Sequence, residues 1–315
     1  MDYTTLGRTG LTTSVIGIGT GGPSRVGLQY GGSESSAREV IRGAIDNGVT
    51  FIDTAQAYRT EAVVGEAIRG VDRHALVLST KISRWQELDA AAVERSIEDR
   101  LRDLGTDYLD ICHLHAVTLD RYDDVIERIY PGLVRAREAG KIRFIGVTEM
   151  FNGDPGHAML GRAVRDDYWD VVMVGFNILN QSARDRVLSV ARDKGIGVLA
   201  MFAVRLALSR RERLVEVMGE LIDRGEVDEQ LLVDLGGNRD DPLGWVVRET
   251  DAESLVEAAY RFVRHEPGID VTLSGTGSVE HLLANIASIL KPPLERGVVE
   301  RLTRLFARVD SVSAQ

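Results

Sequence analysis

The chain has 315 residues, of which 44% are hydrophobic and 27% charged, a composition typical of a soluble globular protein. Its formal net charge of −10 argues against nucleic acid or an anionic membrane surface as a partner, because both repel an acidic protein. Cys112 is the only cysteine, so no internal disulfide can form. No apolar run is long enough to span a bilayer, and the first residues lack the profile of a secretion signal. These features predict a cytoplasmic protein.

Short apolar runs alternate with segments of helical periodicity along the whole chain. Eight runs are predicted to be strands, at 15–19, 50–52, 76–79, 108–111, 143–147, 171–174, 197–200 and 271–273. Helices are predicted at 34–48, 60–70, 89–104, 121–139, 156–165, 182–194, 251–265 and 278–289.

Eight consecutive βα units fit two architectures, a closed (β/α)₈ barrel and an open doubly wound sheet. Periodicity alone does not choose between them. The stretch from Gly17 to Gly22 comes close to a dinucleotide fingerprint, but the next helix begins only near Ser35, too far away for a Rossmann phosphate turn. Eight strands therefore favour a TIM barrel, predicted as one domain over residues 1–315.

Three segments lie outside the repeating units. Residues 3–14 are predicted to form an N-terminal β-hairpin about a glycine turn, and residues 294–309 a C-terminal amphipathic helix. A long loop, 205–250, follows the seventh strand and contains an amphipathic stretch from Glu212 to Arg224. Because barrel active sites lie at the C-terminal ends of the strands, this insertion is predicted to lie over the active-site face and help bound a substrate site.

Four ionisable residues stand at or just beyond the ends of three consecutive strands: Asp53, Tyr58, Lys81 and His115. Each alone has an ordinary structural explanation, but the set is typical of a catalytic group. An aspartate keeps the lysine charged, and that charge is expected to lower the tyrosine pKa from about 10. The tyrosine can then exchange a proton with a carbonyl oxygen that the histidine orients. No side chain supplies hydride, so a cofactor is required.

Several segments resemble the aldo-keto reductase superfamily. Residues 53–58 resemble its D-x-A-x-x-Y signature, and residues 7–11 its N-terminal hairpin. Residues 107–115 and 140–147 are similar to its fourth and fifth strands. Residues 275–281, with Asn285, resemble the loop and helix that hold the adenosine phosphates. The likeness covers nearly the whole chain except 205–250.

The resemblance implies a (β/α)₈ barrel that binds NADP(H), with NAD(H) as the alternative, and that interconverts a small-molecule carbonyl compound (aldehyde, ketone or sugar) and its alcohol. Asp53, Tyr58, Lys81 and His115 match the family's catalytic four. The expected cofactor contacts are Thr20, Gly21, Asp53, Thr148, Glu149, Met173, Met201, Phe202, Gly275, Thr276, Gly277, Ser278, His281 and Asn285.

This chain departs from the family pattern around the cofactor. Glu149 replaces an asparagine, Met173 a glutamine, and Met201 the aromatic residue that stacks on the nicotinamide. Met201 can still cover the ring through its sulfur, whereas Glu149 can accept a hydrogen bond from the amide but not donate one. Gly275 and His281 replace a lysine and an arginine that hold the 2′-phosphate. Only modest preference for NADP(H) is therefore expected, improving as the pH falls.

The positions predicted to surround the substrate carbonyl are Trp85, Ala116, Phe151 and Arg205. Two other functions are weighed. A regulatory barrel that binds the cofactor with little turnover would explain the altered nicotinamide contacts. A glycosidase would pair Asp53 with Glu149, but would leave Lys81 and Tyr58 unexplained.

Two neighbours of His115 are assigned structural roles. His113 faces the same way, one layer deeper, and is predicted to be a buried, hydrogen-bonded core histidine rather than a metal ligand, since no third ligand has suitable spacing. Cys112 faces the helices and is predicted to be inert. The sequence indicates neither the substrate's identity nor the oligomeric state.

Overall fold

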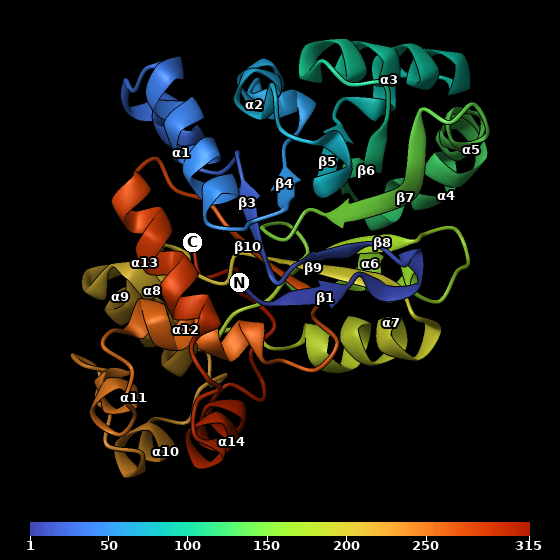
Figure 1. The fold of residues 1–315 in the computed structure, drawn as a ribbon. Helices are drawn as coiled ribbons and strands as arrows, with labels where there is room; N and C mark the ends of the chain where they lie inside the picture. The colour runs from blue at the N-terminus through green and yellow to red at the C-terminus, as the bar shows by residue number, and fades with distance from the viewer.

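Eight parallel strands form a closed barrel in the computed structural model, which describes all residues 1–315 (Figure 1). Strand β10 pairs with both β3 and β9 and so closes the sheet. This confirms the predicted TIM barrel over the open sheet. The barrel strands are β3 (Ile16–Gly19), β4 (Phe51–Asp53), β5 (Val77–Ile82), β6 (Leu109–Val117), β7 (Ile142–Glu149), β8 (Val171–Gly175), β9 (Gly197–Met201) and β10 (Val271–Ser274).

The helices surround the barrel, and their ends follow local sequence signals. Ser33 and Asp89 accept hydrogen bonds from the backbone at the starts of two helices, and Gly105, at φ 64°, ends one of them in the left-handed conformation. The helices that follow barrel strands include α1 (Glu34–Asp46), α2 (Glu61–Ile68), α3 (Ala90–Leu104), α6 (Ala158–Ala163), α12 (Leu255–Arg264) and α13 (Val279–Leu290).

Two predicted helices are less regular than their periodicity suggests. The segment 121–139 consists of α4 (Tyr122–Asp124), a π-helical turn (Val125–Ile129) and α5 (Tyr130–Glu138). Pro131 explains the irregularity, because it lacks an N–H and its ring clashes with the carbonyl four residues earlier. A second π-turn (Arg184–Leu188) precedes α7 (Ser189–Lys194).

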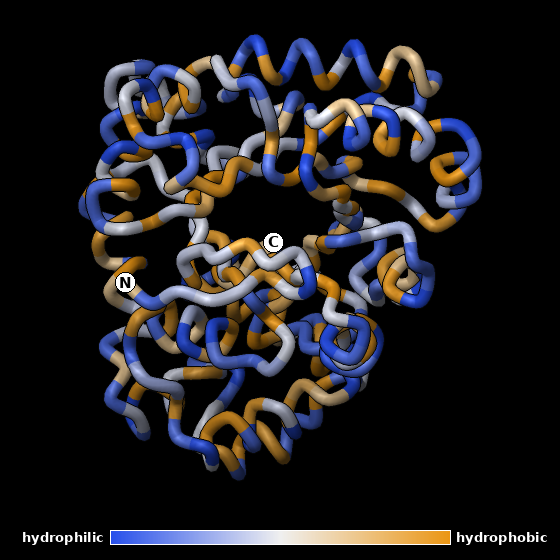
Figure 2. The backbone as a smooth tube through the Cα atoms, turned by 45° about the vertical axis from the view of Figure 1, so that its right-hand side comes forward, coloured by the Kyte–Doolittle hydropathy of each residue, from blue (hydrophilic) through white to orange (hydrophobic).

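The apolar residues form two layers on opposite faces of the sheet. A cluster of 80 buried residues lies between the strands and the helices, and a smaller one of nine fills the barrel interior. The outer helices in Figure 2 alternate between hydrophilic and hydrophobic segments, as expected when one face packs on the barrel. Cys112 belongs to the outer layer, as predicted, and burial raises the pKa of its thiol to about 12.

The N-terminal hairpin closes one end of the barrel. It consists of β1 (Tyr3–Thr5) and β2 (Thr12–Ser14), as the sequence predicts, and Leu6 between them joins the interior cluster. Gly7 has φ +46°, and a Cβ there would lie 2.4 Å from the backbone nitrogen of Gly197. Only glycine allows the hairpin to approach β9 so closely. The opposite, C-terminal end of the barrel therefore remains accessible.

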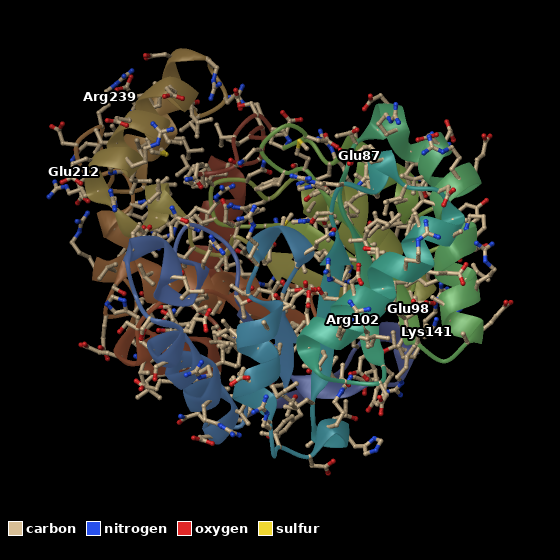
Figure 3. The ribbon with its side chains drawn as sticks, turned by 90° about the horizontal axis from the view of Figure 1, so that it is seen from above. Glu87, Glu98, Arg102, Lys141, Glu212 and Arg239 are labelled. Carbon is tan, nitrogen blue, oxygen red and sulfur yellow. The ribbon has the colours of Figure 1, made fainter.

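The insertion folds into four helices, α8 (Leu206–Ser209), α9 (Arg211–Asp223), α10 (Glu229–Asp234) and α11 (Gly244–Arg248). One of them, α9, coincides with the predicted amphipathic stretch. In Figure 1, α8 and α9 lie beside α12, and α10 and α11 lie below them, and Glu212 and Arg239 lie at the outer edge of the molecule in Figure 3. Within the insertion, only residues up to Ser209 line the groove described below. A contribution of the rest to substrate choice stays a prediction.

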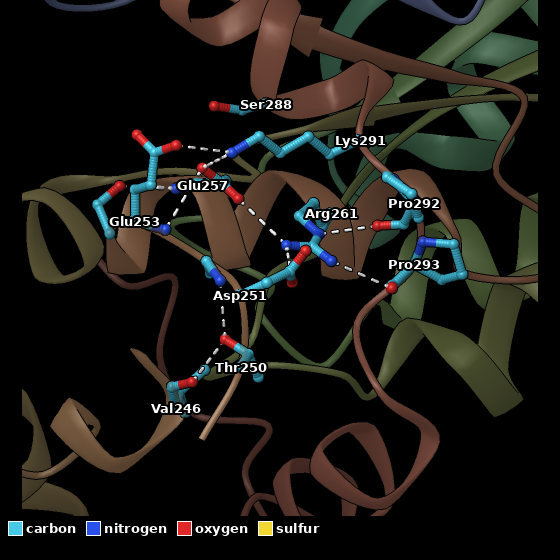
Figure 4. A network of polar contacts seen from close by, with 12 residues as sticks. Val246, Thr250, Asp251, Glu253, Glu257, Arg261, Ser288, Lys291, Pro292 and Pro293 are labelled. Atoms are coloured by element: carbon cyan, nitrogen blue, oxygen red, sulfur yellow. Dashed lines mark hydrogen bonds and ion pairs between the residues drawn. The ribbon is translucent and has the colours of Figure 1, made fainter. Parts of the chain in front are cut away.

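A buried arginine ties the insertion to the C-terminal segment. The Arg261 side chain, 2% exposed, contacts Asp251 (2.6 Å) and Glu257 (3.1 Å) and donates to the carbonyl of Pro292 (2.8 Å), as Figure 4 shows. Lys291 also binds Glu257, at 2.8 Å. The network joins Asp251, the residue after the insertion, to α12 and to the chain before α14 (Arg296–Leu305). None of the helices is both long and apolar enough to cross a membrane.

Candidate active site

A buried ion pair lies at the C-terminal end of the barrel. Lys81 on β5 donates to the Oδ2 atom of Asp53 on β4, at 2.5 Å, and to the carbonyl of Thr54, at 2.8 Å. Ser79 donates to the other carboxylate oxygen of Asp53, at 2.9 Å. Alternate residues of a strand face the same side, which brings these three side chains together inside the barrel.

Burial acts on both partners of this pair, with different results. It raises the pKa of Asp53, and the charge of Lys81 offsets part of that rise. It is also the largest single effect on Lys81, where it disfavours the ammonium. The charges and hydrogen bonds of Asp53 and Tyr58 together outweigh it, so the pKa of Lys81 lies above its ordinary value. The proton therefore stays on Lys81.

Tyr58 lies beside this pair. It ends a short 3₁₀ helix (Gln56–Tyr58), and the Lys81 Nζ atom is 5.0 Å from its ring centroid. Burial raises the pKa of the Tyr58 phenol, and the Lys81 charge lowers it by less. The expected net lowering is therefore wrong for this geometry, because desolvation outweighs the nearby charge. The phenol is a proton donor at neutral pH.

His115 completes the group. Its ring centroid is 5.5 Å from that of Tyr58, with the two planes perpendicular. Its Nδ1 atom lies 2.9 Å from the Ser83 hydroxyl, and Trp85 donates to its backbone carbonyl, also at 2.9 Å. Burial, aided by the Lys81 charge, lowers the His115 pKa to about 3. The ring is therefore neutral, and when Ser83 donates to Nδ1 the ring proton is on Nε2.

Two connected hollows lie at this end of the barrel. A catalytic cavity of about 150 Å³ contains Asp53 and Tyr58 in its wall. A groove of about 470 Å³ runs from it to the start of α13. The residues that line both are Pro23, Ser24, Phe202, Val204, Tyr260 and Gly275.

Most of the predicted cofactor residues line these hollows. The catalytic cavity contains Gly21, Asp53, Met173, Met201, Phe202 and Gly275. The groove also contains Thr276, His281 and Asn285. Gly21 is required for another reason as well, since a Cβ at this position would lie 2.4 Å from the Tyr58 ring.

The other predicted cofactor residues support the walls. Thr20 bonds with Thr60 at 2.8 Å and donates to the Asp53 carbonyl. Ser278 caps α13 by accepting from the backbone of His281, at 3.4 Å. Gly277 packs on Gly27, where a Cβ at position 277 would lie 2.5 Å from the Gly27 Cα.

Thr148 and Glu149 end β7 with different orientations. The Thr148 hydroxyl oxygen accepts from the backbone of Ala116, at 2.8 Å. Glu149 is buried, accepts from the backbone of Gly175 at 2.7 Å, and lies 2.9 Å from the Nδ1 atom of His157. Burial raises the pKa of Glu149, and the nearby histidine offsets part of the rise. Its carboxylate joins β7, β8 and the loop after β7, and does not line the catalytic cavity.

The four predicted substrate residues are spread around the site rather than gathered in the cavity. Trp85 is 1% exposed and supports His115. Ala116 has φ 55° and donates to Thr148. Phe151 is buried and stacks on His157, with ring centroids 5.3 Å apart. Arg205 lines the groove, not the catalytic cavity. Substrate contact by these four stays a prediction.

His113 differs from its prediction in one respect. It is fully buried, as expected, but neither ring nitrogen has a hydrogen-bond partner. Burial lowers its pKa well below the ordinary value, so the ring is uncharged. A Cβ at Gly146 would lie 2.2 Å from its Nδ1 atom, so glycine provides the space for this ring.

Sequence reasoning missed several residues of the site. Tyr260 lines both hollows, and its hydroxyl lies 3.0 Å from Ser274. Its place in an amphipathic helix gave no functional signal. Ser79 on β5 and Ser83 just beyond its end were missed because serine is common at such positions. Pro23 and Ser24 belong to the loop after β3, whose course depends on its contact with Gly277.

Comparison with known proteins agrees with this architecture. The model of the aldo/keto reductase family matches residues 15–306. Aldo-keto reductase YhdN of Bacillus subtilis is 28% identical over 294 residues, which cover 87% of this chain and 85% of that one. The holo form of aldo-keto reductase AKR11C1 from Bacillus halodurans has a TM-score of 0.73 at 21% identity, covering 97% and 96%. An aldo-keto reductase from Klebsiella pneumoniae in complex with NADPH has a TM-score of 0.71 at 23% identity, covering 99% of both chains.

Proposed function

The chain belongs to the aldo/keto reductase family, and we propose that it is an NAD(P)(H)-dependent oxidoreductase that interconverts a small-molecule carbonyl group and the corresponding alcohol. One observation carries the proposal. Tyr58, the Asp53–Lys81 pair and His115 meet at the accessible end of the barrel, beside a cavity that continues into a longer groove. Such a group can move a proton, but it cannot supply hydride.

The residues present fit a nicotinamide dinucleotide. The catalytic cavity is lined by Met173 and Met201, which suit a flat aromatic ring, and it opens directly into the groove. At the far end of the groove, the N-terminus of α13 offers backbone amides and its dipole to a phosphate. The dinucleotide would supply and accept hydride when bound.

Tyr58 is assigned the proton transfer. Its protonated phenol donates to the carbonyl oxygen during reduction and recovers the proton during oxidation. Lys81, held by Asp53, limits the cost of the tyrosinate that forms. Neutral His115 directs a ring N–H toward the same oxygen and fixes the position of the carbonyl.

NADP(H) is the proposed cofactor, with NAD(H) as an alternative. The NADPH complex of the Klebsiella pneumoniae relative supports the first. The groove lining contains His281 and Gly275 but no lysine, and Arg205 is its only arginine. Recognition of the 2′-phosphate therefore depends on backbone amides, hydroxyl groups and a histidine, so discrimination against NAD(H) is expected to be modest.

Absorbance at 340 nm tests the proposal. Purified protein mixed with NADPH and a panel of aldehydes, ketones and sugars is expected to consume NADPH with at least one class of carbonyl compound. Calorimetry with NADPH alone separates the outcomes. Binding without consumption across the panel would favour a regulatory barrel, and absence of binding would reject the proposal.

A further inference from the structure

Arg205 is a half-buried cation that faces the groove without a carboxylate partner. Its side chain donates to two amide oxygens, that of Asn152 at 2.7 Å and that of Gln315. No carboxylate lies within the 4.0 Å that defines an ion pair. Burial with no opposing charge lowers the Arg205 pKa to about 10, so the guanidinium remains charged at neutral pH.

A stack of planar side chains holds Arg205 in place. Its guanidinium carbon lies 4.0 Å from the Phe202 ring centroid. Phe202 stacks on Phe151 at 6.1 Å, and Phe151 stacks on His157 at 5.3 Å, each pair within 16° of parallel. His157 is anchored by Glu149. The stack therefore runs from a buried carboxylate to an arginine in the groove.

Two residues of this stack have sparsely populated backbone conformations. Phe202 has φ 67° and His157 φ 59°, values that bulky side chains rarely adopt. Such conformations persist only where the surroundings enforce them, and they gather at functional sites. These backbone conformations fix the direction of the stack. The Arg205 side chain is therefore already ordered, and it loses less conformational entropy when it binds a ligand.

The position of Phe202 indicates which part of a ligand Arg205 meets. Phe202 lines both the catalytic cavity and the groove, whereas Arg205 lines only the groove. A dinucleotide with its nicotinamide beside Tyr58 and its adenosine beside α13 must pass Phe202 with its central part. That part is the diphosphate, which a guanidinium recognises well.

We infer that Arg205 binds the diphosphate of the nicotinamide dinucleotide. The inference rests on the proposed function and adds to it a residue that recognises the feature common to NADPH and NADH. A guanidinium has five N–H donors, and the contacts with Asn152 and Gln315 use two of them. Three donors remain for phosphate oxygens.

Isothermal titration calorimetry with NADPH and with NADH tests the inference without depending on turnover. Arg205→Ala is expected to raise the Kd of both dinucleotides by a similar factor, about 10- to 100-fold, because both carry the diphosphate. Arg205→Lys keeps the charge but loses the planar guanidinium, so an intermediate loss of dinucleotide affinity is expected. This variant replaces the alanine variant if the latter does not fold. Arg210→Ala is the control, because it removes an exposed arginine that lines neither hollow.

Each contrary result has a distinct meaning. An unchanged Kd for both dinucleotides, with wild-type protein binding them, would overturn this inference alone. A loss confined to NADPH would place Arg205 at the 2′-phosphate and would also overturn it. An equal loss of affinity in Arg210→Ala would mean that the net charge of the protein, and not a contact of Arg205, causes the effect, and it would overturn the inference. Wild-type protein that bound neither dinucleotide would overturn the proposed function as well.

Discussion

Two opposing effects act on Tyr58, and their balance determines which protonation state the site favours. Burial stabilises the neutral phenol, whereas the Lys81 ammonium stabilises tyrosinate. Burial is the larger effect, so the phenol keeps its proton at neutral pH. This state suits carbonyl reduction, in which Tyr58 must donate. Lys81 then matters most after the proton has left.

The pH dependence of reduction follows from these directions. The pKa of Tyr58 is raised above about 10, and that of His115 is lowered to about 3. Neither group changes its charge between about pH 5 and pH 9, which is the range in which assays are practical. We expect kcat/KM for carbonyl reduction to show no ionisation of either group across that range. A fall with a midpoint near neutrality in wild type, absent from a Tyr58 or His115 variant, would contradict this assignment.

Removing Lys81 is expected to affect folding and turnover separately. Lys81→Met leaves the Asp53 charge buried and unpaired, which is expected to lower the free energy of unfolding by about 3–5 kcal/mol. It also removes the charge that favours tyrosinate, so turnover falls by about 10²-fold or more.

The double variant Asp53→Asn/Lys81→Met separates the two effects. It contains no unpaired charge, so urea unfolding should recover most of the lost stability while turnover stays low. Recovery of turnover along with stability would mean that Lys81 acts only on the fold.

Prediction from sequence succeeded for residues whose position follows from strand periodicity. Asp53, Lys81 and His115 face inward at strand ends because alternate residues share a face. Prediction from sequence failed where a side chain can bind more than one partner. Glu149 was expected at the cofactor amide, but it contacts His157, which lies in a loop whose φ of 59° no sequence pattern indicates. The direction of the Tyr58 pKa shift depends on how deeply the phenol is buried, which could not be predicted from the sequence either.

At the level of elements, the start of α13 forms one end of the groove. Ser278 caps it, and His281 in its first turn lines the groove. The strands and most helices could be predicted because their hydrophobic periods are clear. The π-turn before Pro131 and the short helices α8, α10 and α11 could not, because segments of four to six residues carry too little periodicity.

His281→Arg is expected to increase the preference for NADPH over NADH. A fixed charge in the first turn of α13 can pair with a 2′-phosphate, which only NADPH carries, and a gain of about tenfold in the ratio of Kd values is reasonable for one charge-assisted contact. The Kd for NADH should change little. Equal tightening of both dinucleotides would show that position 281 lies near another phosphate. Glu280→Gln, which changes the net charge by the same amount on the neighbouring residue, is the control.

At the scale of the whole molecule, the Arg261 network joins Asp251 and α12 to the chain that follows α13, at Lys291 and the two prolines after it. Arg261→Ala leaves Lys291 as the remaining ion-pair partner of Glu257 and removes the donor of two backbone carbonyls, those of Pro292 and Pro293. Because these carbonyls lose their hydrogen bonds, the free energy of unfolding is expected to fall by about 2–4 kcal/mol. The exposed pair Arg296–Glu300 is the matched comparison, and Arg296→Ala should cost less than about 1 kcal/mol. Similar losses in the two variants by urea unfolding would contradict the importance given to burial.

The Tyr58→Phe variant gives the most direct test of the central claim, that a tyrosine at the end of the barrel transfers the proton. The substitution removes one oxygen and keeps the ring that packs on Gly21, so fold and dinucleotide affinity should be unchanged. Tyr168→Phe, on the outer surface, is the control. With a carbonyl substrate and NADPH in single-turnover conditions, we predict that Tyr58→Phe lowers the rate by at least about 10²-fold while the Kd for NADPH stays within about twofold of wild type. A rate close to wild type, with normal NADPH binding, would contradict the account.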